Sequence, residues 1–184
     1  KVLSRSVHDA YYKVTKKLRF SSEYFNVGIH GQWLSHKSSE ALDFEKNRLS
    51  QVFEREILSC RNHHLFYDKN VTPDAQIGAG IKFDFTLGFN KINGYRRKSA
   101  IPIVVESNAG RLIQIPTLYQ DLVELRHKVE DSLNPFDAID HCAKYGLPFA
   151  LLWHNCWAEN ALEEERIESI LDYAVQNGGF YTTP

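Results

Sequence analysis

Hydrophobic residues recur every three to four positions in several stretches of the chain, which is the spacing of an amphipathic helix. Ser38 and Ser39 precede one stretch as caps. Another stretch opens with Thr72 as N-cap and Pro73 at the first helical position. Glycines follow the last turn of three of the stretches. The pattern predicts helices at residues 4–19, 40–58, 72–80, 134–146 and 161–177.

Short apolar runs lie between these helices and predict strands. The run LPFALLWHN is almost continuously apolar, as in a strand buried on both faces of a parallel sheet. A turn at residues 108–110 joins two of the strands. Because helices and short strands alternate, the chain is predicted to be an α/β protein. The predicted strands lie at residues 24–30, 59–67, 81–89, 101–117 (two strands), 147–155 and 180–183.

The composition is that of an ordinary globular protein and predicts one domain over residues 1–184. A formal net charge of −1 gives no general attraction to nucleic acid, and no apolar run approaches the length of a membrane span. The three cysteines are odd in number and lack a CxxC spacing, which favours reduced thiols and a cytoplasmic location without fixing it. The chain opens with Lys1 and contains no methionine, so we expect a segment to precede it.

Histidines follow three of the predicted strands directly: His30, the His63–His64 pair beside Arg61, and His154. Functional groups of α/β proteins gather at the carboxyl ends of strands. Imidazoles there can bind a metal or transfer protons, because histidine titrates near neutral pH. The pattern therefore predicts a site at the strand ends.

Six segments occur in the order typical of the polysaccharide deacetylase family, the NodB-homology domain: VGIHG, LDFEKNRL, CRNHHLF, FDFTLGF, GYRRKSAIPI and FALLWHN. The chain resembles this family over about residues 26–184. The resemblance implies a distorted, incomplete (β/α) barrel that hydrolyses N-acetyl or other acyl groups on a polysaccharide or oligosaccharide. It also implies a divalent metal, zinc in most members.

The resemblance assigns the metal ligands as follows. His30 matches the first ligand histidine of the family. His36 is a candidate for the second, although it lies six residues on where the family has four, and it also fits a solvated loop. His63 is the alternative second ligand. Nothing before His30 resembles the strand that carries the family's Asp-Asp pair, so the base and one ligand are expected upstream of Lys1 or are lost.

The resemblance also assigns catalytic and binding roles. His154 matches the general acid, which protonates the leaving amine, and Arg61 matches the arginine that orients the base. Trp153 would wall the acetyl pocket, and Tyr95 with Arg96 can line the substrate groove.

Three alternatives stay open. Arg61 can serve as a structural ion-pair partner of Asp84. The domain can be a non-catalytic carbohydrate-binding or scaffold domain that has lost its base. An unrelated metal hydrolase would need Asp84 and Asp121 as ligands.

Overall fold

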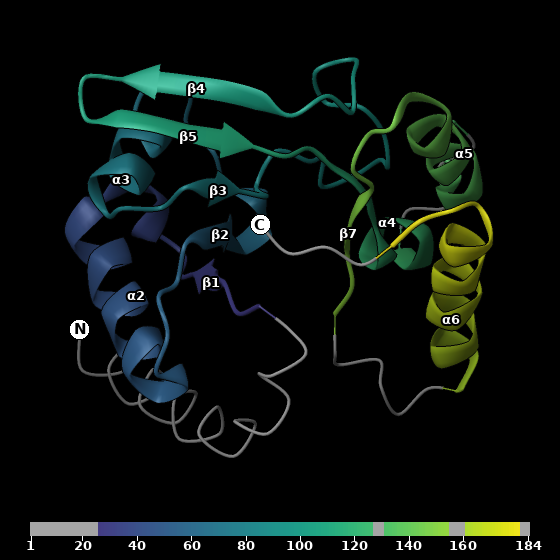
Figure 1. Ribbon diagram of the computed structural model, residues 1–184, viewed down its shortest axis with the longest axis horizontal. Coiled ribbons are helices and arrows are strands. Elements are labelled where there is room, and N and C mark those ends of the chain that lie inside the picture. Colours follow the sequence, from purple (N-terminus) through teal and green to yellow (C-terminus); the bar gives the residue numbers. More distant parts are fainter. Residues whose placement is uncertain (1–25, 127–130, 155–160, 181–184) are drawn as a thin grey trace. The chain divides into compact units, whose positions relative to one another are not determined.

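The computed structural model describes residues 26–126, 131–154 and 161–180 (Figure 1). The helix predicted at 4–19 lies outside these residues, and so does most of the strand predicted at 180–183. The chain divides into two compact units, each described by itself below. Among the described residues, the first comprises residues 26–84 and Val105–Leu112, and the second comprises Phe85–Val104 and the described residues from Ile113 onward.

The first unit is built on a five-stranded sheet with the order β1-β2-β3-β5-β4. Its three leading strands are parallel, with His30 opposite Arg61 and Cys60 opposite Asp84. The predicted mixed α/β fold with a mostly parallel sheet is therefore present, while the described strands form no closed barrel. The strands are β1 (Ile29–Gly31), β2 (Ser59–Asn62), β3 (Phe83–Asp84), β4 (Ile103–Ser107) and β5 (Gly110–Gln114).

Several predicted strands are shorter in the structure. The strand predicted at 59–67 ends at Asn62, because the chain turns into a 3-10 helix, His63–Leu65. The strand predicted at 81–89 keeps only Phe83–Asp84. By contrast, the turn predicted at residues 108–110 is confirmed between β4 and β5.

Helix α2 (Ser39–Phe53) begins as predicted, with the Ser38 hydroxyl accepting a hydrogen bond from the Ala41 amide at 3.1 Å. It ends five residues earlier than predicted, because Glu54 adopts a left-handed conformation with φ of 53°. This turn leads the chain back toward β2. Ile57 still enters the core, from the segment after the helix and not from its last turn.

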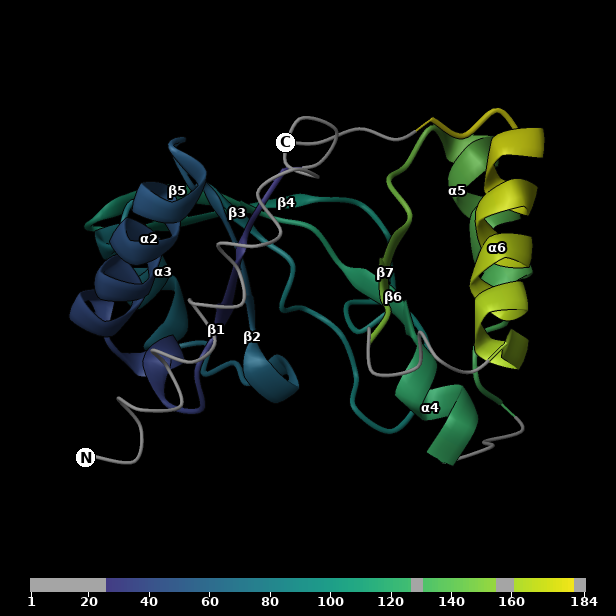
Figure 2. The ribbon, with the colours of Figure 1, turned by 90° about the horizontal axis from the view of Figure 1, so that it is seen from below.

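Helix α3 (Thr72–Gly78) begins one residue earlier than predicted. The Thr72 hydroxyl does not cap the helix, because it accepts a hydrogen bond from the backbone amide of Asp68 at 2.9 Å, in the preceding turn. Helices α2 and α3 lie side by side on one side of the sheet (Figure 1, Figure 2).

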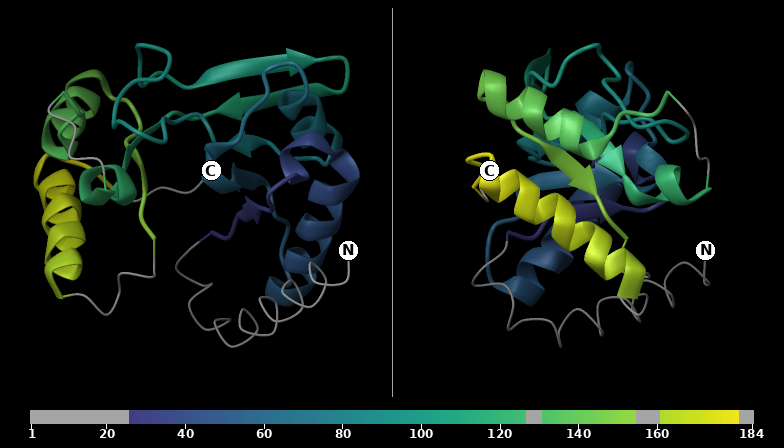
Figure 3. Two further views of the ribbon diagram at one scale, coloured as in Figure 1. Left: turned by 180° about the vertical axis from the view of Figure 1, so that it is seen from behind. Right: turned by 90° about the vertical axis from the view of Figure 1, so that its right-hand side faces the viewer.

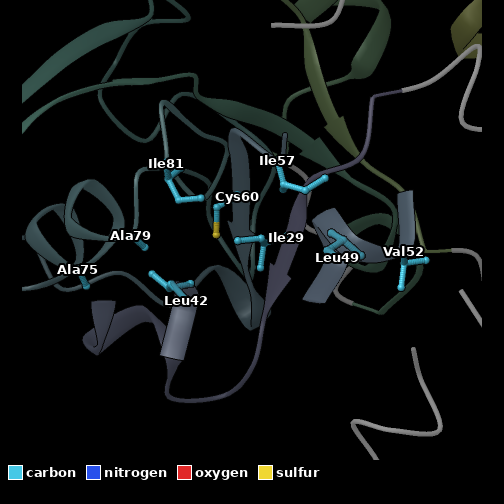
Figure 4. Close-up of a cluster of buried hydrophobic side chains, with 9 residues drawn as sticks. All are labelled: Ile29, Leu42, Leu49, Val52, Ile57, Cys60, Ala75, Ala79 and Ile81. Atoms are coloured by element: carbon cyan, nitrogen blue, oxygen red, sulfur yellow. The ribbon is translucent and has the colours of Figure 1, made fainter. Parts of the chain in front are cut away.

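The core of the first unit lies between these helices and the leading strands. Leu42 from α2 is fully buried beside Ile29 and Cys60 from the two neighbouring strands (Figure 4). Burying a side chain of this size stabilises the fold by about 1.5–3 kcal/mol. The cluster comprises Ile29, Leu42, Leu49, Val52, Ile57, Cys60, Ala75, Ala79 and Ile81.

The second unit contains a two-stranded parallel sheet flanked by helices. The predicted C-terminal helices are confirmed: Asn134 caps α5 through a 2.9 Å bond from the Phe136 amide, and Gly146 ends it with φ of 62°. Helices α5 and α6 lie side by side (Figure 3). The strand predicted at 147–155 keeps three residues and is half-buried, not fully buried. The elements are β6 (Thr117–Gln120), α4 (Asp121–Arg126), α5 (Pro135–Tyr145), β7 (Ala150–Leu152) and α6 (Ala161–Gln176).

No described helix combines the length and apolar character needed to cross a membrane.

One acidic side chain of α2 points into the first unit. Glu45 is only 5% exposed, and its carboxylate accepts a 2.5 Å hydrogen bond from the hydroxyl of Ser35. Burial raises the pKa of Glu45, and the bond from Ser35 opposes this rise. Ser35 opens the 3-10 turn Ser35–Lys37, so this pair connects α2 to the loop that follows β1.

Replacing Glu45 should change how stability depends on pH. A carboxyl group with a raised pKa in the folded state stabilises the fold fully below its unfolded pKa, about 4.3 for Glu. This contribution is lost as the pH rises through the folded pKa. We expect the melting temperature of Glu45→Gln, relative to the wild type, to increase between about pH 4 and pH 7, because glutamine stays uncharged. Thermal unfolding followed by circular dichroism measures this difference.

Glu56→Gln is the matched control, because it removes one carboxylate from an exposed position just after α2. If the difference in melting temperature between Glu45→Gln and the wild type varies with pH no more than the difference for Glu56→Gln, ionisation of the buried Glu45 does not destabilise the fold.

Candidate functional site

Two imidazoles meet at the carboxyl edge of the first unit's sheet. His30 lies in β1, and His63 follows the end of β2. His30 Nε2 lies 3.0 Å from His63 Nδ1, so one nitrogen donates a hydrogen bond and the other accepts it. The parallel register produces this meeting, because β1 and β2 end at the same edge of the sheet.

Asn62 holds the turn that carries His63. Its side-chain amide donates to the Phe66 carbonyl at 3.2 Å, and its carbonyl oxygen accepts from the Cys60 thiol at 3.3 Å. Gly31 lies opposite Asn62, and a Cβ at this glycine would come within 2.9 Å of Asn62 Oδ1. The absence of a side chain at Gly31 therefore lets the two strands carry their imidazoles to the same place.

Charged and polar groups are buried behind this edge. Burial lowers the pKa of Arg61 to about 10, and the nearby negative charge of Asp84 opposes this shift. Arg61 therefore keeps its charge at neutral pH. Asp84 is fully buried and accepts a 2.8 Å hydrogen bond from the side-chain amide of Gln76. The opposite charge and this bond offset the cost of burying the carboxylate.

Cys60 is buried beside the same groups. Burial raises the pKa of its thiol well above the usual value, and the negative charges of Asp84 and Glu45 raise it further. Cys60 therefore stays protonated and donates to Asn62 instead of acting as a thiolate ligand.

His36 takes a different place from the pair. It lies in the 3-10 turn Ser35–Lys37, is 6% exposed and packs against the Phe66 ring with centroids 5.6 Å apart. Burial lowers the pKa of His36, and the positive charge of Lys37 lowers it further. Its Nδ1 has no hydrogen-bond partner among the described residues. Its role as a ligand stays a prediction.

Aromatic rings surround the pair on the loop side. Trp33, just after β1, contacts His64 at 5.3 Å and Phe66 at 5.0 Å between ring centroids, both nearly perpendicular. No motif in the sequence singled out Trp33. Its only signal was the position three residues after His30.

The described residues contain no group of three or more His, Cys, Asp or Glu side chains that could hold a metal ion. The imidazole pair is thus two donors, not a complete ligand set. A hollow lined by Asn26, Val27, Arg55, Glu56, Leu58 and Ser59 lies near the opposite ends of β1 and β2 and includes none of the predicted site residues.

In the second unit, His154 is paired with Asp121. Asp121 directly follows β6, and His154 lies two residues after β7. One carboxylate oxygen accepts from the His154 backbone amide at 2.7 Å, and the other lies 2.7 Å from His154 Nδ1. Asp121 is buried while His154 is 32% exposed, so the carboxylate fixes the ring and leaves Nε2 as the nitrogen free of this pair.

This pairing was not foreseen from the sequence, which offered Asp121 only as a metal ligand of an unrelated hydrolase. The available signal was its position in the sequence. Asp121 ends the segment IPTLYQD, which reads as a short strand, just as His154 follows the apolar run of its own strand.

The predicted substrate-binding residues of the second unit have structural contacts. Trp153 is half-buried and packs against the cluster of Tyr119, Ile139 and Ile170. Tyr95 packs against a second cluster, and burial raises the pKa of its hydroxyl. Arg96 donates to the Gly88 carbonyl at 2.9 Å. Their binding roles stay predictions.

No protein-family model matches the chain, and no curated protein matches it. Among solved structures, it is similar to a protein described as a putative polysaccharide deacetylase from Mycobacterium smegmatis. The two share 15% identity with a TM-score of 0.51, over 90% of this chain and 70% of the other. At this identity the similarity shows the fold alone: a mixed α/β arrangement with a mostly parallel sheet, while the barrel that the resemblance implies is not confirmed.

Removing the Asp121 carboxylate should destabilise the chain. Asp121→Ala leaves the His154 backbone amide and ring nitrogen without their acceptor, and we expect a loss of about 3 kcal/mol in the free energy of unfolding. Asp121→Asn keeps one carbonyl oxygen and should lose less. Urea unfolding measures both, with exposed Asp131→Ala as the control. Equal stability of Asp121→Ala and this control would show that the pair does not hold the His154 segment.

Proposed function

We propose that the chain is a metal-dependent deacetylase that hydrolyses N-acetyl or other acyl groups on a polysaccharide or oligosaccharide. The observation that carries this proposal is the approach of His30 and His63 to 3.0 Å at the carboxyl edge of a parallel sheet. The deacetylase-like fold of the M. smegmatis protein supports the reaction class, and an incomplete (β/α) barrel is the architecture that we propose for the intact domain.

The donor set fits zinc in part. His30 Nε2 and His63 Nδ1, which lie 3.0 Å apart, would be two of its ligands, because imidazole nitrogens bind zinc. A third ligand and the catalytic base would come from the Asp-Asp strand that the resemblance places before β1, and His36 remains a further candidate ligand. When bound, zinc supplies Lewis-acid activation of water and of the acyl oxygen.

His154 is our candidate for the general acid. Its Nδ1 is bound to Asp121, so Nε2 is the atom that would hold the proton for the leaving amine. The carboxylate fixes the ring's orientation, so His154 can give up a proton without first reorienting.

Arg61 has a positioning role in this proposal. Its charge lies near that of Asp84, which supports the structural part of its predicted role. The same charge would orient a carboxylate base supplied by a neighbouring strand.

A second function, non-catalytic carbohydrate binding, is favoured by one observation: the described residues hold no three-membered ligand group. The two functions differ in whether acetate is released.

Zinc binding tests the metal site first. We expect one zinc ion per chain, bound at least ~10-fold more weakly by His30→Ala and by His63→Ala, a change of about 1.4 kcal/mol. Titration calorimetry with elemental analysis measures this, and His141→Ala, on an exposed position of α5, is the control. Unchanged affinity in both variants would show that the pair is not the metal site.

Acetate release then separates the two functions. In a protein that carries an Asp-Asp strand before β1, His154→Asn should keep its zinc and release acetate from N-acetylated glycans about 10²–10⁴-fold more slowly, because it has lost the proton donor. If the wild type of that protein binds zinc and releases no acetate, the non-catalytic function is favoured.

A further inference from the structure

We infer that Trp33 is a stacking platform for a pyranose ring of the glycan, beside the imidazole pair. The class of ligand, a glycan, follows from the proposed function. The choice of Trp33 rests on the geometry of its surroundings.

Trp33 is exposed although it is among the most hydrophobic side chains of the loop after β1. It is 57% exposed, and its neighbours on the loop do not cover it. Burying a large aromatic side chain is favourable, so an indole left in water at a strand end is available for a ligand with an apolar face. The C–H face of a pyranose is such a surface.

The exposed indole is nevertheless held in place. His64 and Phe66 contact it with interplanar angles of 81° and 79°, and His63 contacts it at 6.1 Å with an angle of 54°. Perpendicular aromatic pairs of this kind stabilise a structure. None of the three rings is stacked parallel on Trp33, so these contacts orient the indole without hiding it.

The backbone that presents these rings is strained. His64 and Leu65 both have φ of 52°, a left-handed conformation that is unfavourable for residues other than glycine. Burial of Leu65 and the bond from Asn62 to the Phe66 carbonyl hold the turn in this form. The same turn carries His63 to His30 and His64 to Trp33, so one local structure arranges both the imidazole pair and the indole.

The position of Trp33 indicates which part of a glycan it would bind. Because its ring lies 6.1 Å from that of His63, a sugar stacked on it lies next to the imidazole pair. An N-acetylated pyranose, the sugar of the proposed substrate, has an apolar C–H face and fits this position.

Binding of the N-acetylglucosamine tetramer to the full chain tests this inference. We use calorimetry on metal-free protein, which cannot turn the sugar over, and on zinc-loaded protein. Trp33→Ala should bind at least ~10-fold more weakly. Trp33→Phe keeps an aromatic face, so its affinity should stay within about threefold of the wild type. This variant shows that weaker binding by Trp33→Ala is not caused by loss of folding. Phe44→Ala removes an equally exposed ring from α2 and should bind as the wild type does.

Tryptophan fluorescence adds a readout that a purely structural role would not change. The chain has three tryptophans, and the sugar should shift the emission of the wild type more than that of Trp33→Phe, which keeps Trp153 at the proposed acetyl pocket. Equal affinity of Trp33→Ala and the wild type, an emission shift of the same size in Trp33→Phe, or no binding by the wild type would each overturn the platform. Zinc affinity and acetate release are measured separately, so these outcomes do not decide the proposed function.

Discussion

In the first unit, β1, β2 and β3 run in the same direction, and their carboxyl ends therefore lie at one edge of the sheet. His30 and His63 are 33 residues apart in the chain, yet this pairing brings their ring nitrogens to 3.0 Å. The approach depends on Gly31, where any side chain would collide with Asn62. A shift of register by one residue would turn His30 toward the helices and leave no pair, because side chains alternate between the faces of a strand.

Buried polar groups lie behind this edge of the sheet. Asp84 is fully buried and accepts from the amide of Gln76, the charge of Arg61 lies near it, and Cys60 stays a neutral thiol. The opposite charge and this hydrogen bond offset the cost of burying the carboxylate, while Gln76 Oε1 has no hydrogen-bond partner among the described residues.

In the second unit, one buried residue positions the histidine. Asp121 accepts from both the backbone and the ring of His154, and it also accepts from the Leu122 amide at 2.7 Å. A buried carboxylate with three donors has one stable position, and the histidine takes its orientation from it. In each unit, then, a group buried behind a strand end determines where a histidine points.

The sequence by itself determined the α/β class, the helix that begins after Ser38, the hairpin at residues 108–110 and the C-terminal helices, because caps, glycine stops and periodicity act over a few residues. It also placed histidines at strand ends. Only the tertiary structure decided that the strand predicted at 59–67 ends at Asn62, that His63 faces His30 and that Asp121 holds His154. These outcomes depend on register and on contacts between distant segments, which no local pattern contains.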